Sequence, residues 1–158
     1  MATDPIEVRV VTFPETRIAV AEHRGPPEKE PETVARLVAW RKANRVPPDR
    51  HRSFGIHYDD WRRTPPDAYR VDFAVEFEHD IPPNSQGVLG KLIPGGRCAV
   101  ARHKGSYDST PISDYLLGVW LPQSPYKLRD FPIFFHYVTI GPGVQEHEMV
   151  TDVYLPLQ

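Results

Sequence analysis

The sequence predicts an α+β protein built from two tandem, pseudo-symmetric βαββ units, each forming an antiparallel sheet with one helix packed on it. One observation is a repeat, because Ile18–Gly25 matches Cys98–Gly105 at an offset of 80 residues. A second is that the same order of strand-like and helix-like patterns follows each match. The third is that most of the 18 prolines fall between these patterns, as turns between short strands require. We therefore expect one domain over residues 1–158, with repeats at 7–77 and 87–157 and a connection at 78–86.

The first copy is expected to begin with two strands separated by a turn at Phe13-Pro14-Glu15. A helix follows, because Val34, Leu37 and Val38 form a helical stripe before the prolines at 47 and 48. The last strand alternates apolar and polar residues, as a half-buried antiparallel strand does. The predicted elements are strands at 7–11, 16–23, 54–59 and 69–77 and a helix at 33–44.

The second copy repeats this order after a polar connection rich in turn formers. Pro111 suits the first turn of its helix, and Pro122 is expected to end that helix. The predicted elements are strands at 87–92, 97–103, 133–139 and 149–157 and a helix at 111–121.

The composition is typical of a soluble globular protein, and we expect it in the cytoplasm. The chain is 40% hydrophobic and 25% charged, without a run of about 20 apolar residues or a secretory signal after Met1. Its net charge is -2 and its basic clusters are short, so neither a membrane nor a nucleic acid is an expected direct partner. The single cysteine, Cys98, lies in an apolar run and is expected to be buried.

Several segments, taken in order, carry a resemblance to a known family. They are Ile93–Tyr107, Trp120–Ser124, His136–Tyr137 and Asp152–Pro156 in the second copy, with His57–Asp60 and Arg70–Asp72 in the first. Their order and doubling resemble the GyrI-like family, the DNA gyrase inhibitor-like small-molecule-binding proteins, over nearly the whole chain. The resemblance implies two βαββ units related by a pseudo-two-fold axis, with a ligand groove between them that accepts flat, often cationic or drug-like compounds.

In such relatives the module is the effector-binding domain of multidrug-responsive regulators, a stand-alone antagonist of gyrase-directed toxins, or a hydrolase of cyclopropane-containing genotoxins. The two repeats occupy residues 8–157, which leaves no room for a two-helix DNA-reading unit. We therefore expect the stand-alone bacterial form.

The resemblance also implies an acidic residue near the centre of the last strand, facing aromatic rings, and Asp152 matches that position, where Glu is common. A carboxylate among ring faces suits a delocalised cation. Strand alternation puts Asp152 and Tyr154 on one side and Val153 and Leu155 on the other. The alternative is that Asp152 hydrogen-bonds to a neighbouring Arg or Tyr, as Asp72 would in the first copy.

The remaining candidates are aromatic or polar residues on strands near this acid. Trp40 and Trp120 hold equal places on the two helices and are interpreted as core. His57 and His136 recur at an offset of 79, but no third ligand accompanies them, so we expect no metal, no cofactor and no catalytic residue. The predicted ligand-binding residues are Asp152, Tyr154, Tyr137, Phe135, Tyr58 and His57.

The first functional hypothesis is a protein that sequesters or senses a small aromatic or amphiphilic ligand, cationic ones included. A hydrolase in which Asp152 activates water is one alternative. Because Asp withdraws the carboxylate by roughly 1.5 Å relative to Glu, we expect slow or absent turnover. The other alternative is a protein that binds DNA gyrase or a separate regulator.

Overall fold

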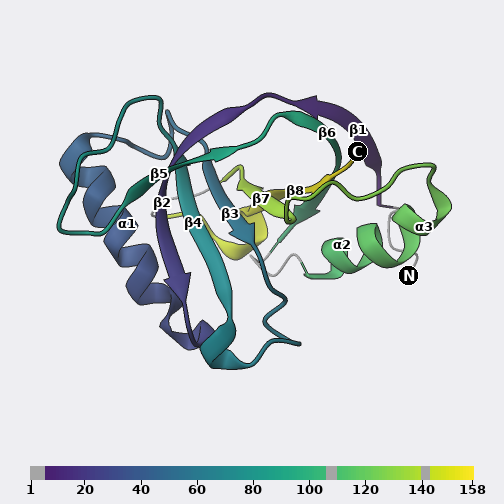
Figure 1. Ribbon diagram of the computed structural model, residues 1–158, viewed down its shortest axis with the longest axis horizontal. Helices are drawn as coiled ribbons and strands as arrows, with labels where there is room; N and C mark the ends of the chain where they lie inside the picture. Colours follow the sequence, from purple (N-terminus) through teal and green to yellow (C-terminus); the bar gives the residue numbers. More distant parts are fainter. Residues whose placement is uncertain (1–5, 106–109, 140–142) are drawn as a thin grey trace. The chain divides into compact units, whose positions relative to one another are not determined.

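The computed structural model describes residues 6–105, 110–139 and 143–158, and the chain divides into two compact units (Figure 1). Glu15–Pro94 form one, called here the central unit. Met1–Pro14 and Gly95–Gln158 together form the other, called here the terminal unit. Each combines antiparallel strands with a helical segment, so the predicted α+β class is confirmed. No helix among the described residues is long and apolar enough to cross a membrane.

The central unit contains an antiparallel sheet with the strand order β3-β4-β2-β5. Asp72 on β4 lies opposite Glu22 on β2 and opposite Ile56 on β3. These three residues therefore form one row across the sheet and project on the same side. The strands are β2 (Thr16–Arg24), β3 (Ser53–His57), β4 (Arg70–Glu76) and β5 (Leu89–Ile93), with short 3-10 helices at Pro27–Lys29 and Pro66–Ala68.

The helix of the central unit, α1 (Glu30–Asn44), has the end signals expected of a stable helix. A proline and two glutamates lie in its first turn, where a fixed φ and negative charge favour helix formation. Arg45, with φ of 57°, follows in the left-handed conformation that often closes a helix. Leu37 and Trp40 pack against Ala19, Ala21 and Val75 of the sheet. The helix thus covers one side of that sheet.

The terminal unit contains an antiparallel sheet with the order β1-β6-β8-β7. Asp152 on β8 lies opposite Arg102 on β6 and opposite His136 on β7, so these three residues also form one row. The strands are β1 (Val8–Phe13), β6 (Gly96–Lys104), β7 (Phe134–Tyr137) and β8 (Val150–Pro156), with a short 3-10 helix at Glu146–Glu148.

The helical segment of the terminal unit is less regular than α1. It runs through α2 (Thr110–Tyr115), a π-helical turn (Leu116–Trp120) and α3 (Leu121–Gln123). Pro122 was expected to end the helix, but the helical segment continues past it to Gln123, with Pro122 in the first turn of α3. Ser106 and Tyr107, which belong to the segment Ile93–Tyr107, lie outside the described residues.

The first two strands of each predicted copy do not pair with each other, although a strand-turn-strand start was expected. β1 pairs with β6 in the terminal unit, and β5 pairs with β2 in the central unit. Only Pro14-Glu15 separate β1 from β2, and only Pro94-Gly95 separate β5 from β6. A two-residue hairpin turn normally needs positive φ at its first central position, which proline cannot adopt. Each compact unit therefore takes its edge strand from the other predicted repeat.

Each sheet has a helix side, packed on the helical segment, and a far side. In the terminal unit Ala99, Phe135 and Val153 lie on the helix side with Ile112 and Leu116 of the helical segment. The alternate residues Val100, Arg102, Asp152 and Tyr154 project on the far side. In the central unit the far side carries Val20, Glu22, Asp72 and Ile56.

Candidate functional site

Asp152 is held by a two-pronged ion pair with Arg102 on the far side of the terminal unit. Arg102 donates from Nε to Oδ1 at 2.8 Å and from Nη2 to Oδ2 at 3.1 Å. The Asp152 side chain is 9% exposed, whereas that of Arg102 is 51% exposed. The hydrogen bonds to Asp152 raise the pKa of Arg102 above its usual value. The carboxylate is thus neutralised by the chain's own guanidinium, and the sequence-based alternative of a hydrogen bond to a neighbouring Arg matches this geometry.

Two stacked aromatic rings lie in the row next to this ion pair. Tyr154 on β8 is opposite Phe134 on β7, and their ring centroids are 4.9 Å apart with an interplanar angle of 2°. The ring of Phe13 meets both edge-on, at 5.0 Å from Phe134 and 5.2 Å from Tyr154. Phe134 is buried and Tyr154 half-buried. The terminal unit therefore combines an aromatic cluster with a charge pair on one side of its sheet.

The other two aromatic candidates lie on the opposite side of that sheet. Phe135 is opposite Val153 and Tyr137 is opposite Thr151, so both project towards the helical segment. Their rings meet edge-on at 6.4 Å. We expected Phe135 and Tyr137 to lie beside Asp152 in a ligand groove. The register puts both on the other side of the sheet from Asp152, because successive residues of a strand project on alternate sides. A ligand contact by either ring stays a prediction.

Asp72, the counterpart of Asp152, has more partners. It is 0% exposed and accepts hydrogen bonds from Arg24 Nη1 at 3.0 Å and Lys91 Nζ at 2.7 Å. The Tyr58 hydroxyl donates to its Oδ2 at 2.8 Å. Lys91 also contacts Glu22 Oε2 at 2.7 Å. Burial opposes the charge of Lys91, but the hydrogen bonds to Asp72 and Glu22 outweigh it and raise its pKa.

The ring of Tyr58 is surrounded by cations that belong to the chain. The charged groups of Arg24 and Arg70 lie 5.5 Å from its centroid, and Lys91 Nζ lies 5.7 Å away. Arg70 is in turn paired with Asp59 at 3.0 Å. Burial and the hydrogen bond to Asp72 raise the pKa of Tyr58, so the phenol stays protonated. Since its π-face already faces three resident cations, Tyr58 is poorly suited to hold a cationic ligand.

His57 projects on the helix side of the central unit, opposite Val71. Burial lowers the pKa of its imidazole to about 4, so His57 is neutral near pH 7. The proposed equivalence of His57 and His136 at an offset of 79 is wrong. The residue opposite Asp72 is Ile56, whereas His136 is opposite Asp152, so the offset of 80 continues through β3 and β7.

Sequence reasoning missed the residues that neutralise the two aspartates. They are Arg102 in the terminal unit and Arg24 and Lys91 in the central unit. A signal was present, because position 22 is Glu and position 102 is Arg at the offset that also aligns Asp72 with Asp152. The sequence alone does not show that positions 22 and 102 lie opposite the two aspartates, because this depends on the pairing of β2 with β4 and of β6 with β8.

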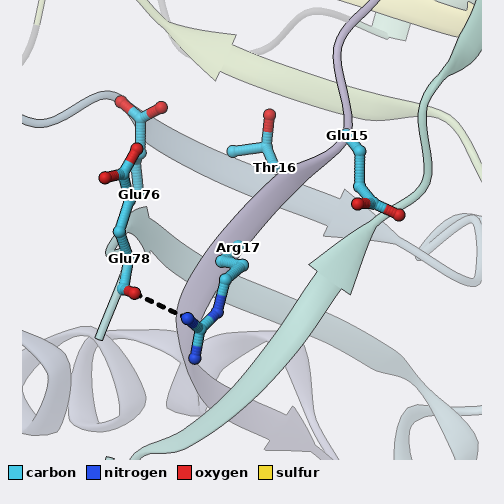
Figure 2. Close-up of a pocket in the computed structure, with 5 residues that line it drawn as sticks. All are labelled: Glu15, Thr16, Arg17, Glu76 and Glu78. Atoms are coloured by element: carbon cyan, nitrogen blue, oxygen red, sulfur yellow. Dashed lines mark hydrogen bonds between the residues drawn. The ribbon is translucent and has the colours of Figure 1, made fainter. Parts of the chain in front are cut away.

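A shallow surface depression in the central unit contains none of the predicted site residues. Figure 2 shows Arg17 in this depression, with its Nη1 donating to the backbone oxygen of Glu78 at 2.6 Å. Glu76 is held by Arg52 at 2.7 Å, which lowers the pKa of the Glu76 carboxyl. The depression is lined by Glu15, Thr16, Arg17, Glu76 and Glu78. Within the described ranges, no group of three His, Cys, Asp or Glu side chains is arranged to hold a metal ion.

Comparison with protein families connects this geometry to a known domain. The model of the GyrI-like small-molecule binding domain matches residues 6–158. The chain belongs to the GyrI-like family. The GyrI-like resemblance of the sequence is thereby confirmed, and the chain is a GyrI-like small-molecule binding domain.

Two curated relatives illustrate the names that GyrI-like proteins carry. The chain is 39% identical to the probable transcriptional regulator YgiV of Escherichia coli strain K12 over 156 residues, with 96% of each chain covered. It is 27% identical to the DNA gyrase inhibitor of Erwinia billingiae over 156 residues, covering 96% of this chain and 97% of the relative.

Solved structures share the GyrI-like fold at lower identity. The C-terminal domain of EcmrR matches with a TM-score of 0.74 and 16% identity, covering 97% of this chain and 98% of that domain. In the EcmrR–DNA complex, with 18% identity and a TM-score of 0.74, the match covers 97% of this chain but only 57% of the EcmrR chain. SAV2435 bound to tetraphenylphosphonium matches with a TM-score of 0.56 and 8% identity, covering 96% of this chain and 94% of SAV2435.

Proposed function

We propose that this GyrI-like domain binds a small, flat aromatic or amphiphilic compound and thereby sequesters or senses it. The observation that carries the proposal is the far side of the terminal unit, where Tyr154 and Phe134 stack beside the Asp152–Arg102 ion pair. Small-molecule sites commonly combine aromatic surface with a few fixed polar groups. Tyr154 supplies a half-buried ring with a polar hydroxyl, and the ion pair supplies fixed charge.

The comparisons support an aromatic ligand in general terms. SAV2435, which shares the fold, is described in complex with tetraphenylphosphonium, a cation that carries four aromatic rings. YgiV is named a probable transcriptional regulator, which is consistent with a sensing role. DNA gyrase and a separate regulator remain the two candidate partners.

Paired tyrosine variants test which side of the sheet contacts the ligand. We expect flat aromatic dyes to bind the wild-type protein in fluorescence titrations. Tyr154→Leu removes the stacking ring on the far side and should weaken binding at least tenfold, because aromatic pairs and their buried area contribute strongly to recognition. Tyr137→Leu makes the same change on the helix side and should leave affinity nearly unchanged. Equal loss in both variants would place the site elsewhere, and no binding by any flat aromatic dye would refute the proposal.

The same samples test the hydrolase alternative. Both carboxylate oxygens of Asp152 accept hydrogen bonds from Arg102, and this cation stabilises the ionised carboxylate and makes Asp152 a weak general base. We therefore expect a cyclopropane-bearing electrophile to be recovered unchanged after incubation with the protein, as followed by chromatography. Multiple-turnover cleavage that Asp152→Asn abolishes, with the fold intact, would assign the protein to the hydrolases.

A further inference from the structure

Arg102 occupies the position on Asp152 that a cationic ligand would need. Its Nε and Nη2 bind one carboxylate oxygen each, which is the strongest geometry available between these two side chains. A bound cation would have to displace this guanidinium and leave it without its partner. A lipophilic cation without N–H groups could not replace either hydrogen bond. The ion pair therefore disfavours cations on this side of the sheet.

The same guanidinium retains donors for an anion. Arginine carries five N–H donors in a planar fork, and the contacts with Asp152 use two of them. The side chain of Arg102 makes no other hydrogen bond within the part of the chain that the structure describes, and half of it is exposed. Asp152 fixes its orientation. An anchored guanidinium with free donors is suited to bind a second carboxylate.

The charges around Arg102 favour an anion further. Arg9 and Lys104 project from β1 and β6 on the same side as Arg102, and both are exposed. Neither makes an ion pair within residues 6–105, 110–139 and 143–158. Among the described residues on this side of the strands, the acids are Asp152, which is already neutralised, and Glu7, which precedes β1. The far side of the terminal unit thus carries more positive than negative groups.

The central unit provides an internal comparison. Glu22 is opposite Asp72 just as Arg102 is opposite Asp152. There the two carboxylates are balanced by Arg24 and Lys91, and every one of these charges has a partner. The charges of this cluster therefore balance one another. Only in the terminal unit does the position opposite the aspartate present a cation with unused donors.

We propose that Arg102 determines the charge of the ligand, so that the far side of the terminal unit selects aromatic carboxylates over aromatic cations. This inference rests on the proposed function and adds the ligand class. The carboxylate would bind the free N–H groups of Arg102 while its ring packs on Tyr154. Selection of a cation would instead require Arg102 to leave Asp152.

Three probes with the same ring system test this selectivity. The compounds are 1-naphthoate, 1-naphthalenemethanol and (1-naphthylmethyl)trimethylammonium, an ammonium compound without N–H groups, titrated calorimetrically at pH 7.5. For the wild-type protein we expect 1-naphthoate to bind at least tenfold more tightly than the ammonium compound. In Arg102→Gln, 1-naphthoate should lose tenfold or more while the ammonium compound gains, because the Asp152 charge is uncovered. Arg102→Lys keeps the charge without the fork and should be intermediate.

Arg97→Gln is the matched control. Arg97 is on the same strand, but its position opposite Thr12 puts it on the helix side, where its guanidinium lies over Tyr126. Its loss removes the same charge and should leave the order of the three affinities unchanged. Tighter binding of the ammonium compound to the wild-type protein, or the same selectivity in Arg102→Gln, would overturn the inference while the proposed function stands. Failure of all naphthalenes and all flat dyes to bind would instead refute the proposed function.

Discussion

Acidification is expected to destabilise this domain through His57. Burial holds the pKa of its imidazole at about 4, whereas the unfolded chain has the ordinary value of about 6.5. Between these values the unfolded state binds a proton that the folded state does not. Stability therefore rises with pH through this window, is fully present above the unfolded value and is lost as the pH falls towards 4.

The size of the effect follows from the two pKa values. Between pH 8 and pH 5, the difference in proton binding amounts to about 2 kcal/mol of unfolding free energy, at 1.36 kcal/mol per pKa unit. This is a large part of the stability of a domain of ordinary size. His57→Gln removes the titrating group and should remove this part of the pH dependence.

Urea unfolding of the wild-type protein and His57→Gln at pH 5 and pH 8 measures the effect. The difference between the two pH dependences isolates His57, because the other titrating groups cancel. His147→Gln is the control, since the His147 side chain is 75% exposed. An equal pH dependence in the wild-type protein and His57→Gln would show that burial of His57 does not control its protonation.

Two further predictions concern buried polar groups. Asp72→Asn should lower the unfolding free energy by about 2 to 4 kcal/mol, because Asp72 is fully buried and Arg24 and Lys91 each lose one of their two carboxylate partners. Urea unfolding measures this loss, and a loss smaller than that of Asp152→Asn, whose partner is half exposed, would contradict the argument. Thr151→Val should stabilise the protein by about 1 kcal/mol, because the Thr151 hydroxyl is buried without a hydrogen bond in the described part of the chain. The reverse change in the central unit, Val71→Thr, should destabilise the protein. Thermal unfolding of the two variants measures both effects, and destabilisation by Thr151→Val would refute the argument.

Most elements of the fold could be predicted because their patterns are local. The alternation in residues 69–77 and the helical stripe before Pro47 identify β4 and α1 without any knowledge of their partners. The offset of 80 residues relates Asp72 to Asp152, and their partners Glu22 and Arg102 are separated by the same offset. Ligand-facing sides were harder, because they depend on pairing between distant strands.

β7 shows why the candidate site was only partly predictable. Phe134 and Phe135 are both apolar and both buried, so alternation does not reveal which of them shares a side with Asp152. That choice is set by the register with β8, where Phe134 is opposite Tyr154 and His136 is opposite Asp152. A displacement of one residue reverses the side of every side chain. The choice of Phe135 and Tyr137 over Phe134 and His136 follows from this ambiguity.

The pairing of β1 with β6 and of β5 with β2 has a topological consequence for a cleaved chain. A cut within residues 78–86 would leave one fragment carrying β1 to β4 and another carrying β5 to β8. The first fragment would lack β5, the edge strand that pairs with its β2, and would carry β1, the edge strand of the other sheet. The second fragment would lack β1, which pairs with its β6, and would carry β5. Two such halves complement each other reciprocally, so a single peptide-bond cleavage would not be expected to yield two independently folding proteins.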